Sequence, residues 1–311
     1  MAEKKLMVSS SPHLRSSDTV QTIMRDVLIA LTPAVVAAFY FFGADALWVI
    51  AVSVASCVFS EALWQKLLGR PQTIGDLSAI VTGVLLAFNL PSSVPLWLPA
   101  IGGVFAMIVV KHFFGGIGQN IVNPALAARA VLLASWPVAM TTWTIDGVTT
   151  ATPLALLKEG SVSALPPLFD VFVGHVGGCL GETSVVALLL GGAYLLYRHV
   201  ISWHVPVVYI GTVSILTLVL GRQGFMSGNP LYEMCLGGLM LGAIFMATDY
   251  TTSPMTKKGQ VIFALGCGLL TTLIRLYGGY AEGVSYSILI MNLFVPLIDR
   301  ITIPRVFGEV R

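Results

Sequence analysis

Charged residues are scarce in this chain of 311 residues: only 10% are Asp, Glu, Lys or Arg, whereas 56% are hydrophobic. Soluble domains average about a quarter charged residues, and the mean hydropathy of +0.86 lies far from that balance. A separate soluble domain is therefore excluded. The chain supplies apolar runs of about 17 to 25 residues almost end to end, so an all-α polytopic protein embedded in the lipid bilayer is expected.

Other scarcities exclude further classes. The formal net charge of +2 is too small for a nucleic-acid-binding surface. The four cysteines are widely spaced, with neither a Cys-x-x-Cys pair nor a nearby histidine cluster, so no metal site is predicted. No hydrophobic run precedes about residue 27, so the layout of a cleaved signal peptide is missing. We expect a cytoplasmic segment over residues 1–26 and a single membrane domain over residues 27–305.

Polar, Gly or Pro breaks divide the apolar runs into ten candidate spans. These are centred near residues 35, 55, 83, 104, 130, 190, 212, 238, 267 and 290. Several are short, notably the one that ends at Asn89-Leu90-Pro91. Broken helices at membrane depth are tolerated where they are buried in protein or line a cavity, as in transporter-like folds.

The placement of Lys and Arg orients the chain, because these residues favour the cytoplasmic side. With the amino terminus inside, thirteen of them are cytoplasmic, three are exterior, and Arg129 falls within a span. The thirteen are Lys4, Lys5, Arg15, Arg25, Lys66, Arg70, Lys111, Arg198, Lys257, Lys258, Arg300, Arg305 and Arg311; the three are Lys158, Arg222 and Arg275. Both termini are therefore expected inside, and the polar loop of residues 139–181 is expected outside.

Two pairs of segments are weakly similar at a spacing of about five spans. "TGVLLAFNLPSSVP" from Thr82 resembles "LGAIFMATDYTTSP" from Leu241, and "FFGGIGQNIVNPA" from Phe113 matches "LYGGYAEGVSYSI" from Leu276. An odd number of spans between equivalent segments inverts the second copy in the membrane. The repeats would cover residues 27–138 and 182–305, unless the likeness only reflects convergent Gly-rich membrane sequence.

The segment "GGIGQNIVNPALAAR" is the first candidate for a binding site. Glycines permit close backbone approach, and amides precede a helix opened by Pro124, which suits an anionic or polar group. The alternative is a re-entrant turn whose glycines only allow helix packing. Arg129 lies within the following span, where a cation faces either a polar ligand or a structural ion-pair partner. The candidate residues are Gly115, Gly116, Gln119, Asn120, Asn123 and Arg129.

Acidic residues in or beside spans form a second group of candidates. Thr248 and Asp249 end a span in "MATDYTTSP", where Asp249 either helps to bind an ion or flavin ring or is simply a solvated helix end. Glu61, Glu233 and Asp299 also lie in or near spans, and spacing alone does not rank them.

The third candidate is the threonine-rich stretch "DGVTTATPL". Asp146-Gly147 is a turn signal, and Thr149, Thr150 and Thr152 present three hydroxyls before Pro153. By composition alone, a hydroxyl-rich exterior loop is most simply a soluble covering of the membrane domain.

Five motifs taken together resemble the RnfD/NqrB family of membrane subunits. They are "SPH" at 11–13, "GGIGQNIVNPA" at 115–125, "DGVTTATPL" at 146–154, "MATDYTTSP" at 246–254 and "EGVSYSILIMNLFVPLIDR" at 282–300. The resemblance covers residues 11–305 and implies a urea-transporter-like fold of ten transmembrane helices in two inverted five-helix repeats. It also implies a multi-pass protein of the bacterial cytoplasmic membrane.

In that family a threonine hydroxyl carries FMN through a phosphoester. The family motif falls here on Asp146, Thr149, Thr150, Ala151, Thr152, Pro153 and Leu154, which implies attachment at Thr152. The usual glycine is Thr150 in this chain, so Thr149 and Thr150 stay open as acceptors. The resemblance to the quinone reductase component suggests riboflavin as a second flavin, and the segment from Gly115 to Asn123, with Arg129, is expected to hold the FMN ring or that second flavin.

The implied function is electron carriage in the Rnf complex, which oxidises ferredoxin, reduces NAD and moves Na⁺ or H⁺ outward. Its implied partners are the other Rnf subunits, RnfA, RnfB, RnfC, RnfE and RnfG, and a flavin transferase. "GGIGQN" follows a membrane helix and not a strand, so NAD is expected to bind elsewhere. The short amino-terminal segment favours Rnf over an NqrB-like component of the sodium-pumping quinone reductase. A passive solute channel on the same scaffold is the rival from another class.

Overall fold

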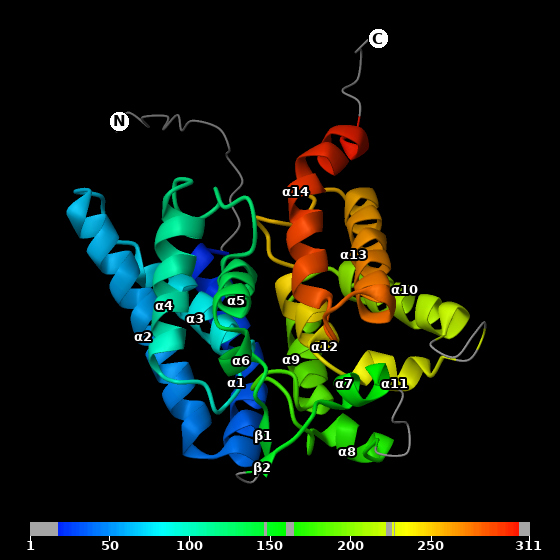
Figure 1. Cartoon of the computed structure of the whole chain (residues 1–311). Helices are drawn as coiled ribbons and strands as arrows, with labels where there is room; N and C mark the ends of the chain where they lie inside the picture. The colour runs from blue at the N-terminus through cyan, green and yellow to red at the C-terminus, as the bar shows by residue number, and fades with distance from the viewer. Residues whose placement is uncertain (1–17, 146–147, 160–164, 222–225, 227, 305–311) are drawn as a thin grey trace, which may run out of the picture.

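A computed structural model describes residues 18–145, 148–159, 165–221, 226 and 228–304 (Figure 1). Most of these residues are helical, and the strands β1 (Thr144–Ile145) and β2 (Val148–Thr149) form one short antiparallel pair. Four helices are long and apolar enough to cross a membrane: α1 (Val20–Phe42), α2 (Ala44–Leu67), α13 (Lys257–Tyr277) and α14 (Val284–Thr302). Shorter apolar helices accompany them, as expected for a multi-pass membrane protein.

The shorter helices lie where the apolar runs predict spans. They are α3 (Ser78–Phe88), α4 with the π-helix η2 (Trp97–Val104, Phe105–His112), α5 (Pro124–Ser135), α9 (Val185–Tyr197) and α10 (His204–Leu220). Every predicted span centre lies within a helix except residue 238. There the chain is broken into α11 (Pro230–Cys235), α12 (Leu239–Leu241) and the π-helix η4 (Gly242–Met246), with Gly237 at φ +68°.

The polar segment between α5 and α9 is folded where the structure describes it. After the short helix α6 (Pro137–Met140) come β1, β2, α7 (Pro153–Lys158) and α8 (Leu168–Val173). In Figure 1 these elements gather with α11 at the lower end of the molecule, opposite the carboxyl end of α14 at the top. The sequence predicted only a polar loop here, because such short elements carry no periodic pattern.

Side-chain caps fix several helix starts. Asn123 accepts hydrogen bonds from the backbone N–H groups of Ala125 and Leu126, and Pro124 follows at the first helical position of α5. The same geometry opens α7, where the Thr152 hydroxyl accepts from the Ala155 N–H at 3.2 Å. The predicted helix start at Pro124 is confirmed.

Small residues allow the helices to approach closely. A Cβ at Gly83 would lie 2.6 Å from the Cα of Val54, where α3 packs against α2, and a Cβ at Gly191 would collide with the carbonyl oxygen of Ala30, where α9 packs against α1. Helices in membranes associate largely through such close packing. The α5 and α14 helices also contact each other.

Two of the cations counted for the orientation are buried. Lys111 is 3% exposed and its Nζ lies 2.8 Å from Glu61 Oε1, while Arg275 is fully buried and pairs with Glu233 at 3.2 Å. An ion-pair partner compensates each charge inside the protein, so neither is a free surface charge. Leaving out Lys111 and Arg275 changes the count of cytoplasmic to exterior Lys and Arg from thirteen against three to twelve against two. The bias therefore still favours the same orientation.

Replacement of Gly191 by Ala is expected to destabilise the protein by about 1–3 kcal/mol, because the new methyl group would collide with the backbone of α1. Thermal unfolding in detergent measures the change. Gly211→Ala is the matched control, because no atom lies within 4 Å of a Cβ built there. Equal stability of the two variants would contradict the close contact between α1 and α9.

Candidate functional site

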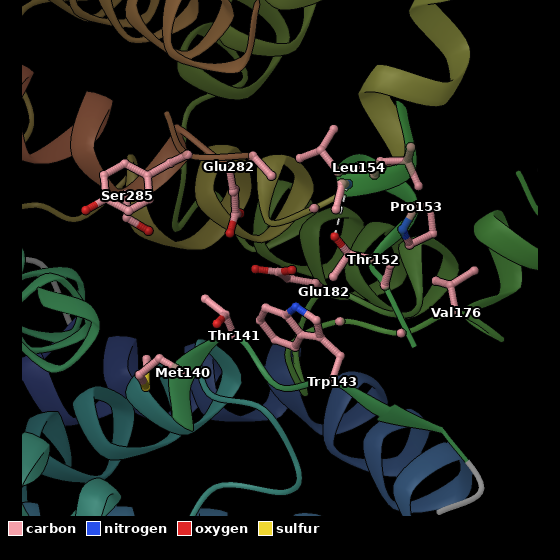
Figure 2. A pocket seen from close by; sticks show the side chains of 18 of the residues that line it. Met140, Thr141, Trp143, Thr152, Pro153, Leu154, Val176, Glu182, Glu282 and Ser285 are labelled. Atoms are coloured by element: carbon pink, nitrogen blue, oxygen red, sulfur yellow. Dashed lines mark hydrogen bonds between the residues drawn. The ribbon is translucent and has the colours of Figure 1, made fainter. Parts of the chain in front are cut away.

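A cavity lies beside the threonine-rich segment (Figure 2). Its volume is about 450 Å³, and its walls come from α5, the segment around β2 and α7, the chain before α9, and the turns before α12 and α14. We call it pocket 1. Its polar lining residues are Arg129, Thr141, Thr150, Thr152, Glu182, Thr183, Glu282 and Ser285, with Trp143, Tyr280 and Tyr286 as aromatic neighbours.

The threonine cluster forms one wall of pocket 1. Thr152 and Thr150 both line it, together with Ala151 and Pro153. The Thr152 hydroxyl caps α7, whereas the buried Thr150 hydroxyl has no hydrogen-bond partner among the described residues. Thr149 belongs to β2, whose backbone pairs with Thr144, and Asp146 lies outside the described residues.

Local packing holds this wall in place. Leu154 in α7 is buried, and it forms a small hydrophobic cluster with Val171 of α8 and Leu236. Lys158 at the end of α7 donates a hydrogen bond of 2.6 Å to the carbonyl oxygen of Gly278. The segment that bears Thr152 is thereby anchored to the rest of the protein at both ends of α7.

Arg129 projects from α5 into pocket 1, where it meets two carboxylates. Its Nη2 forms a short hydrogen bond with Glu282 Oε2 and lies 3.5 Å from Glu182 Oε1. Its Nη1 donates to Asn89 Oδ1 at 3.1 Å and to Ser285 Oγ at 2.8 Å. Figure 2 shows both carboxylates directed toward the same central space. The buried Arg129 therefore both forms an ion pair and lines a polar cavity.

The two carboxylates differ in their surroundings. Burial, together with the negative charge of Glu282, raises the pKa of Glu182 to about 8. Burial also acts to raise the pKa of Glu282, but the adjacent Arg129 guanidinium outweighs it and lowers this pKa below its usual value. Glu282 is the charged partner of Arg129, and Glu182 is the carboxyl group that keeps a proton to higher pH.

The other predicted site residues do not gather around pocket 1. Asn120, Asn123, Thr248 and Asp249 line a second cavity of about 100 Å³, pocket 2. There Asn120 Nδ2 donates to Thr251 Oγ1 at 3.0 Å, and Asp249 accepts from the hydroxyls of Thr251 and Thr252. The predicted combination of the Gly115–Asn123 segment with Arg129 is therefore divided between two cavities.

Gly115, Gly116 and Gln119 line neither cavity. Gly115 and Gly116 have φ values of +125° and +105°. Residues other than glycine rarely adopt this backbone conformation. Their backbone N–H groups bond to the carbonyl oxygens of His112 and Lys111. In this structure Gly115 and Gly116 form part of the turn between η2 and α5.

A chain of side-chain contacts connects the two cavities. Arg129 in pocket 1 bonds to Asn89, whose Nδ2 lies 3.7 Å from Met246 Sδ. The carbonyl oxygen of Met246 accepts from Asn123 Nδ2, which lines pocket 2. These contacts join residues from both halves of the chain.

Sequence reasoning missed the partners of three buried cations. Glu182 and Glu282 were not singled out as partners of Arg129, and neither Glu61 nor Glu233 was recognised as the partner of Lys111 or Arg275. The demand that a buried cation be compensated was visible in the sequence, whereas the partner's position depends on the fold.

Fold and site together define a helical membrane protein with a buried, partly charged cavity beside a polar, threonine-bearing segment. Residues 7–308 match the model of the NQR2, RnfD, RnfE family, and the chain belongs to this family.

Named relatives agree with this assignment, and each is the component designated D in its own complex. In the Na⁺-translocating ferredoxin:NAD⁺ oxidoreductase complex of Acetobacterium woodii, this component is 54% identical over 314 residues, covering 99% of this chain and 97% of the relative. In the proton-translocating ferredoxin:NAD⁺ oxidoreductase complex of Clostridium ljungdahlii it is 50% identical over 319 residues, covering 98% and 96%. In an ion-translocating oxidoreductase complex of Halorhodospira halophila it is 36% identical, covering 97% and 95%.

Replacement of Arg129 by Gln is expected to destabilise the protein by about 3–5 kcal/mol, because it leaves Glu282 buried without its cation. Unfolding in detergent, followed by circular dichroism, measures the loss. The control is Lys66→Gln on the exposed end of α2, for which a change within about 0.5 kcal/mol is expected. Equal stability of both variants would show that the ion pair does not hold the pocket.

Proposed function

We propose that this chain is the RnfD component of an Rnf-type complex and carries FMN bound through its phosphate to Thr152. In this role it passes electrons within a complex that couples ferredoxin:NAD⁺ electron transfer to Na⁺ or H⁺ translocation. Family membership over nearly the whole chain and the names of its relatives support the place in the complex. The observation that carries the flavin assignment is the position of Thr152 on the wall of a large, mixed polar and aromatic cavity.

Pocket 1 fits a flavin by size and by chemistry. Its volume of about 450 Å³ lies within the usual range of roughly 300–1,000 Å³ for ligand sites. Two of its buried polar atoms, Thr150 Oγ1 and Glu182 Oε1, have no hydrogen-bond partner among the described residues. Buried polar groups are normally hydrogen-bonded, so these atoms suit the ring oxygens and nitrogens of a ligand. Trp143, Tyr280 and Tyr286 offer aromatic surfaces to a planar ring.

When bound, the flavin supplies the redox chemistry, and the protein supplies position and electrostatics. Thr152 would hold the phosphate at the edge of pocket 1, while Arg129 and Glu182 would face the ring. The Arg129 charge is already balanced by Glu282, so the phosphate gains little from it. This favours an arrangement with the ring toward the charged cluster and the phosphate toward the polar segment.

Thr152 is a better acceptor than Thr150 on geometric grounds. Thr152 is half-buried and accepts a hydrogen bond through its hydroxyl oxygen, so its O–H bond is free to be replaced by an ester bond. An ester oxygen keeps a lone pair, and the cap of α7 can persist. The Thr150 hydroxyl is buried, which hinders a flavin transferase. Thr150 is therefore assigned to ligand contact and Thr152 to attachment.

The proposed membrane arrangement follows the predicted one. Ten membrane segments in two inverted repeats would pair α1 with α9 and α5 with α14, and both pairs are in contact. The span around residue 238 would be the broken helix from α11 to η4. The Lys and Arg bias supports cytoplasmic termini and an exterior FMN-bearing segment, and the elements from β1 to α8 lie at the end of the molecule opposite the carboxyl end of α14 (Figure 1).

Riboflavin would be the second flavin, held by the segment from Gly115 to Asn123. Asn120 and Asn123 of that segment line pocket 2 together with Thr248 and Asp249, and its volume of about 100 Å³ is below the usual range for such ligands. A flavin there would require the walls of pocket 2 to move apart.

The rival functions make different demands on the structure. A passive solute channel would need no covalent flavin, whereas the proposed electron carrier requires one. An NqrB-like role would be supported by quinone-dependent oxidation of the flavin in the purified complex, which we expect to be absent.

Thr152→Ala is expected to abolish covalent flavin, whereas Thr150→Gly, which introduces the residue usual in the family, is expected to keep it. In-gel flavin fluorescence after denaturing electrophoresis, with the flavin transferase coexpressed, measures both. Thr141→Ala is the matched control, because Thr141 also lines pocket 1. A non-fluorescent wild-type band would overturn the flavin assignment, and a band lost only on Thr150→Gly would move the attachment.

A further inference from the structure

Pocket 1 contains one more carboxylate than its cation can balance. Both oxygens of Glu282 are engaged, because Oε2 bonds to Arg129 and Oε1 accepts from the Gly238 N–H at 2.6 Å. Glu182 is only 8% exposed, and its Oε1 lies 3.5 Å from Arg129 Nη2 without any hydrogen-bond partner among the described residues. Glu282 is therefore the ion-pair partner, and Glu182 is the surplus acid.

The other titratable groups around Glu182 do not balance its charge. Cys179, from the chain before α9, is buried beside Arg129 and donates to the carbonyl oxygen of Asn89 at 3.3 Å. Tyr280 and Tyr286 stack on each other at 5.3 Å. Arg275 of α13 bonds instead to Glu233 and to the carbonyl oxygen of Leu236. Arg129 is thus the one cation that lines the pocket within the described residues.

The two carboxylates lie close together beside one backbone position. A Cβ at Gly238 would collide with Glu282 Oε1 and would lie 3.0 Å from Glu182 Oε1. Both acids therefore press against the same backbone position at the turn before α12. Two buried carboxylates held together cannot both ionise easily, so an added negative charge nearby would favour protonation of one of them.

We propose that Glu182 is the proton-binding group of pocket 1, which takes up a compensating proton when the bound redox cofactor becomes more negative. The proposal rests on the proposed function, since it assumes that a flavin occupies this pocket. Glu182 would act as a positioning and charge-balancing residue beside the cofactor. It would make electron arrival in pocket 1 dependent on pH.

The charge balance follows directly. Reduction of a bound flavin by two electrons from the reduced carrier that feeds the complex, together with one solvent proton, would add one negative charge to pocket 1. The ionised Glu182 carboxylate then forms an O–H bond with a second solvent proton. No bond in the protein is broken. The net negative charge added to the pocket is one unit smaller than it would be without this proton on Glu182.

The direction of the pH effect follows from the raised pKa of Glu182, about 8 in this pocket. Below that pH Glu182 already holds its proton before the electrons arrive, so it takes up none. Above it Glu182 is ionised with oxidised cofactor, and the added negative charge raises its pKa further. The extra uptake is therefore confined to alkaline pH.

The test counts the protons taken up per two electrons by the purified complex during stoichiometric reduction. At about pH 9 the wild type is expected to take up as much as one proton more than Glu182→Gln, whereas at about pH 6 the two should be equal. Glu159→Gln is the matched control, since Glu159 is exposed and does not line pocket 1. Equal counts for wild type and Glu182→Gln at both pH values would overturn the proposal.

A second measurement covers a Glu182→Gln variant that does not assemble. Redox-induced infrared difference spectra of the wild-type complex at alkaline pH should gain a protonated carboxylic acid band that shifts with isotope-labelled glutamate. Its absence would also overturn the proposal. Every sample is first checked for covalent flavin by in-gel fluorescence. A wild type without flavin would refute the proposed function, whereas intact flavin without the extra proton would refute only the role of Glu182.

Discussion

The centre of this protein depends on the ion pair and the hydrogen bonds of the buried Arg129 guanidinium. A cation inside a membrane protein requires compensation, and Arg129 obtains it from Glu282, Asn89 and Ser285. These partners come from the turn before α14, the broken end of α3 and the first turn of α14. One side chain of α5 therefore joins segments that are distant in sequence, since Arg129 and Glu282 are 153 residues apart. Pocket 1 is formed around it.

The same compensation rule explains the other buried charges. Lys111 pairs with Glu61 and bonds to Ser78, and Arg275 pairs with Glu233, so both buried cations have an acidic neighbour. Pocket 1 departs from this one-to-one pairing, because Glu182 adds a second carboxylate beside a single cation. A surplus acid in a ligand-sized cavity is the kind of environment that shifts protonation equilibria at functional sites.

Much of the fold was predictable from the sequence, because apolar runs and capping residues are local signals. The Asn123-Pro124 start of α5 and the break at Asn89-Leu90-Pro91 were both visible, and both are confirmed. For the span near residue 238 the sequence indicated only a centre, and the structure divides this region into the short helices α11, α12 and η4. The helices α7 and α8 were missed, since they are held by packing of Leu154 and Val171 rather than by a periodic pattern.

The site was predictable in its residue types but not in its assembly. The threonine segment and Arg129 were both candidates, yet only the fold places them around one cavity and assigns Asn120, Asn123, Thr248 and Asp249 to another. Pairing of residues distant in sequence depends on packing, which spacing does not encode.

The central claim is that pocket 1 is a flavin site with its anchor at Thr152. Peptide mass spectrometry of the protein, coexpressed with its flavin transferase, tests it most directly. The account predicts a peptide heavier by FMN less one water, with fragmentation that places the added mass on Thr152. An unmodified Thr152, with the added mass absent or found on Thr149 or Thr150, would contradict it.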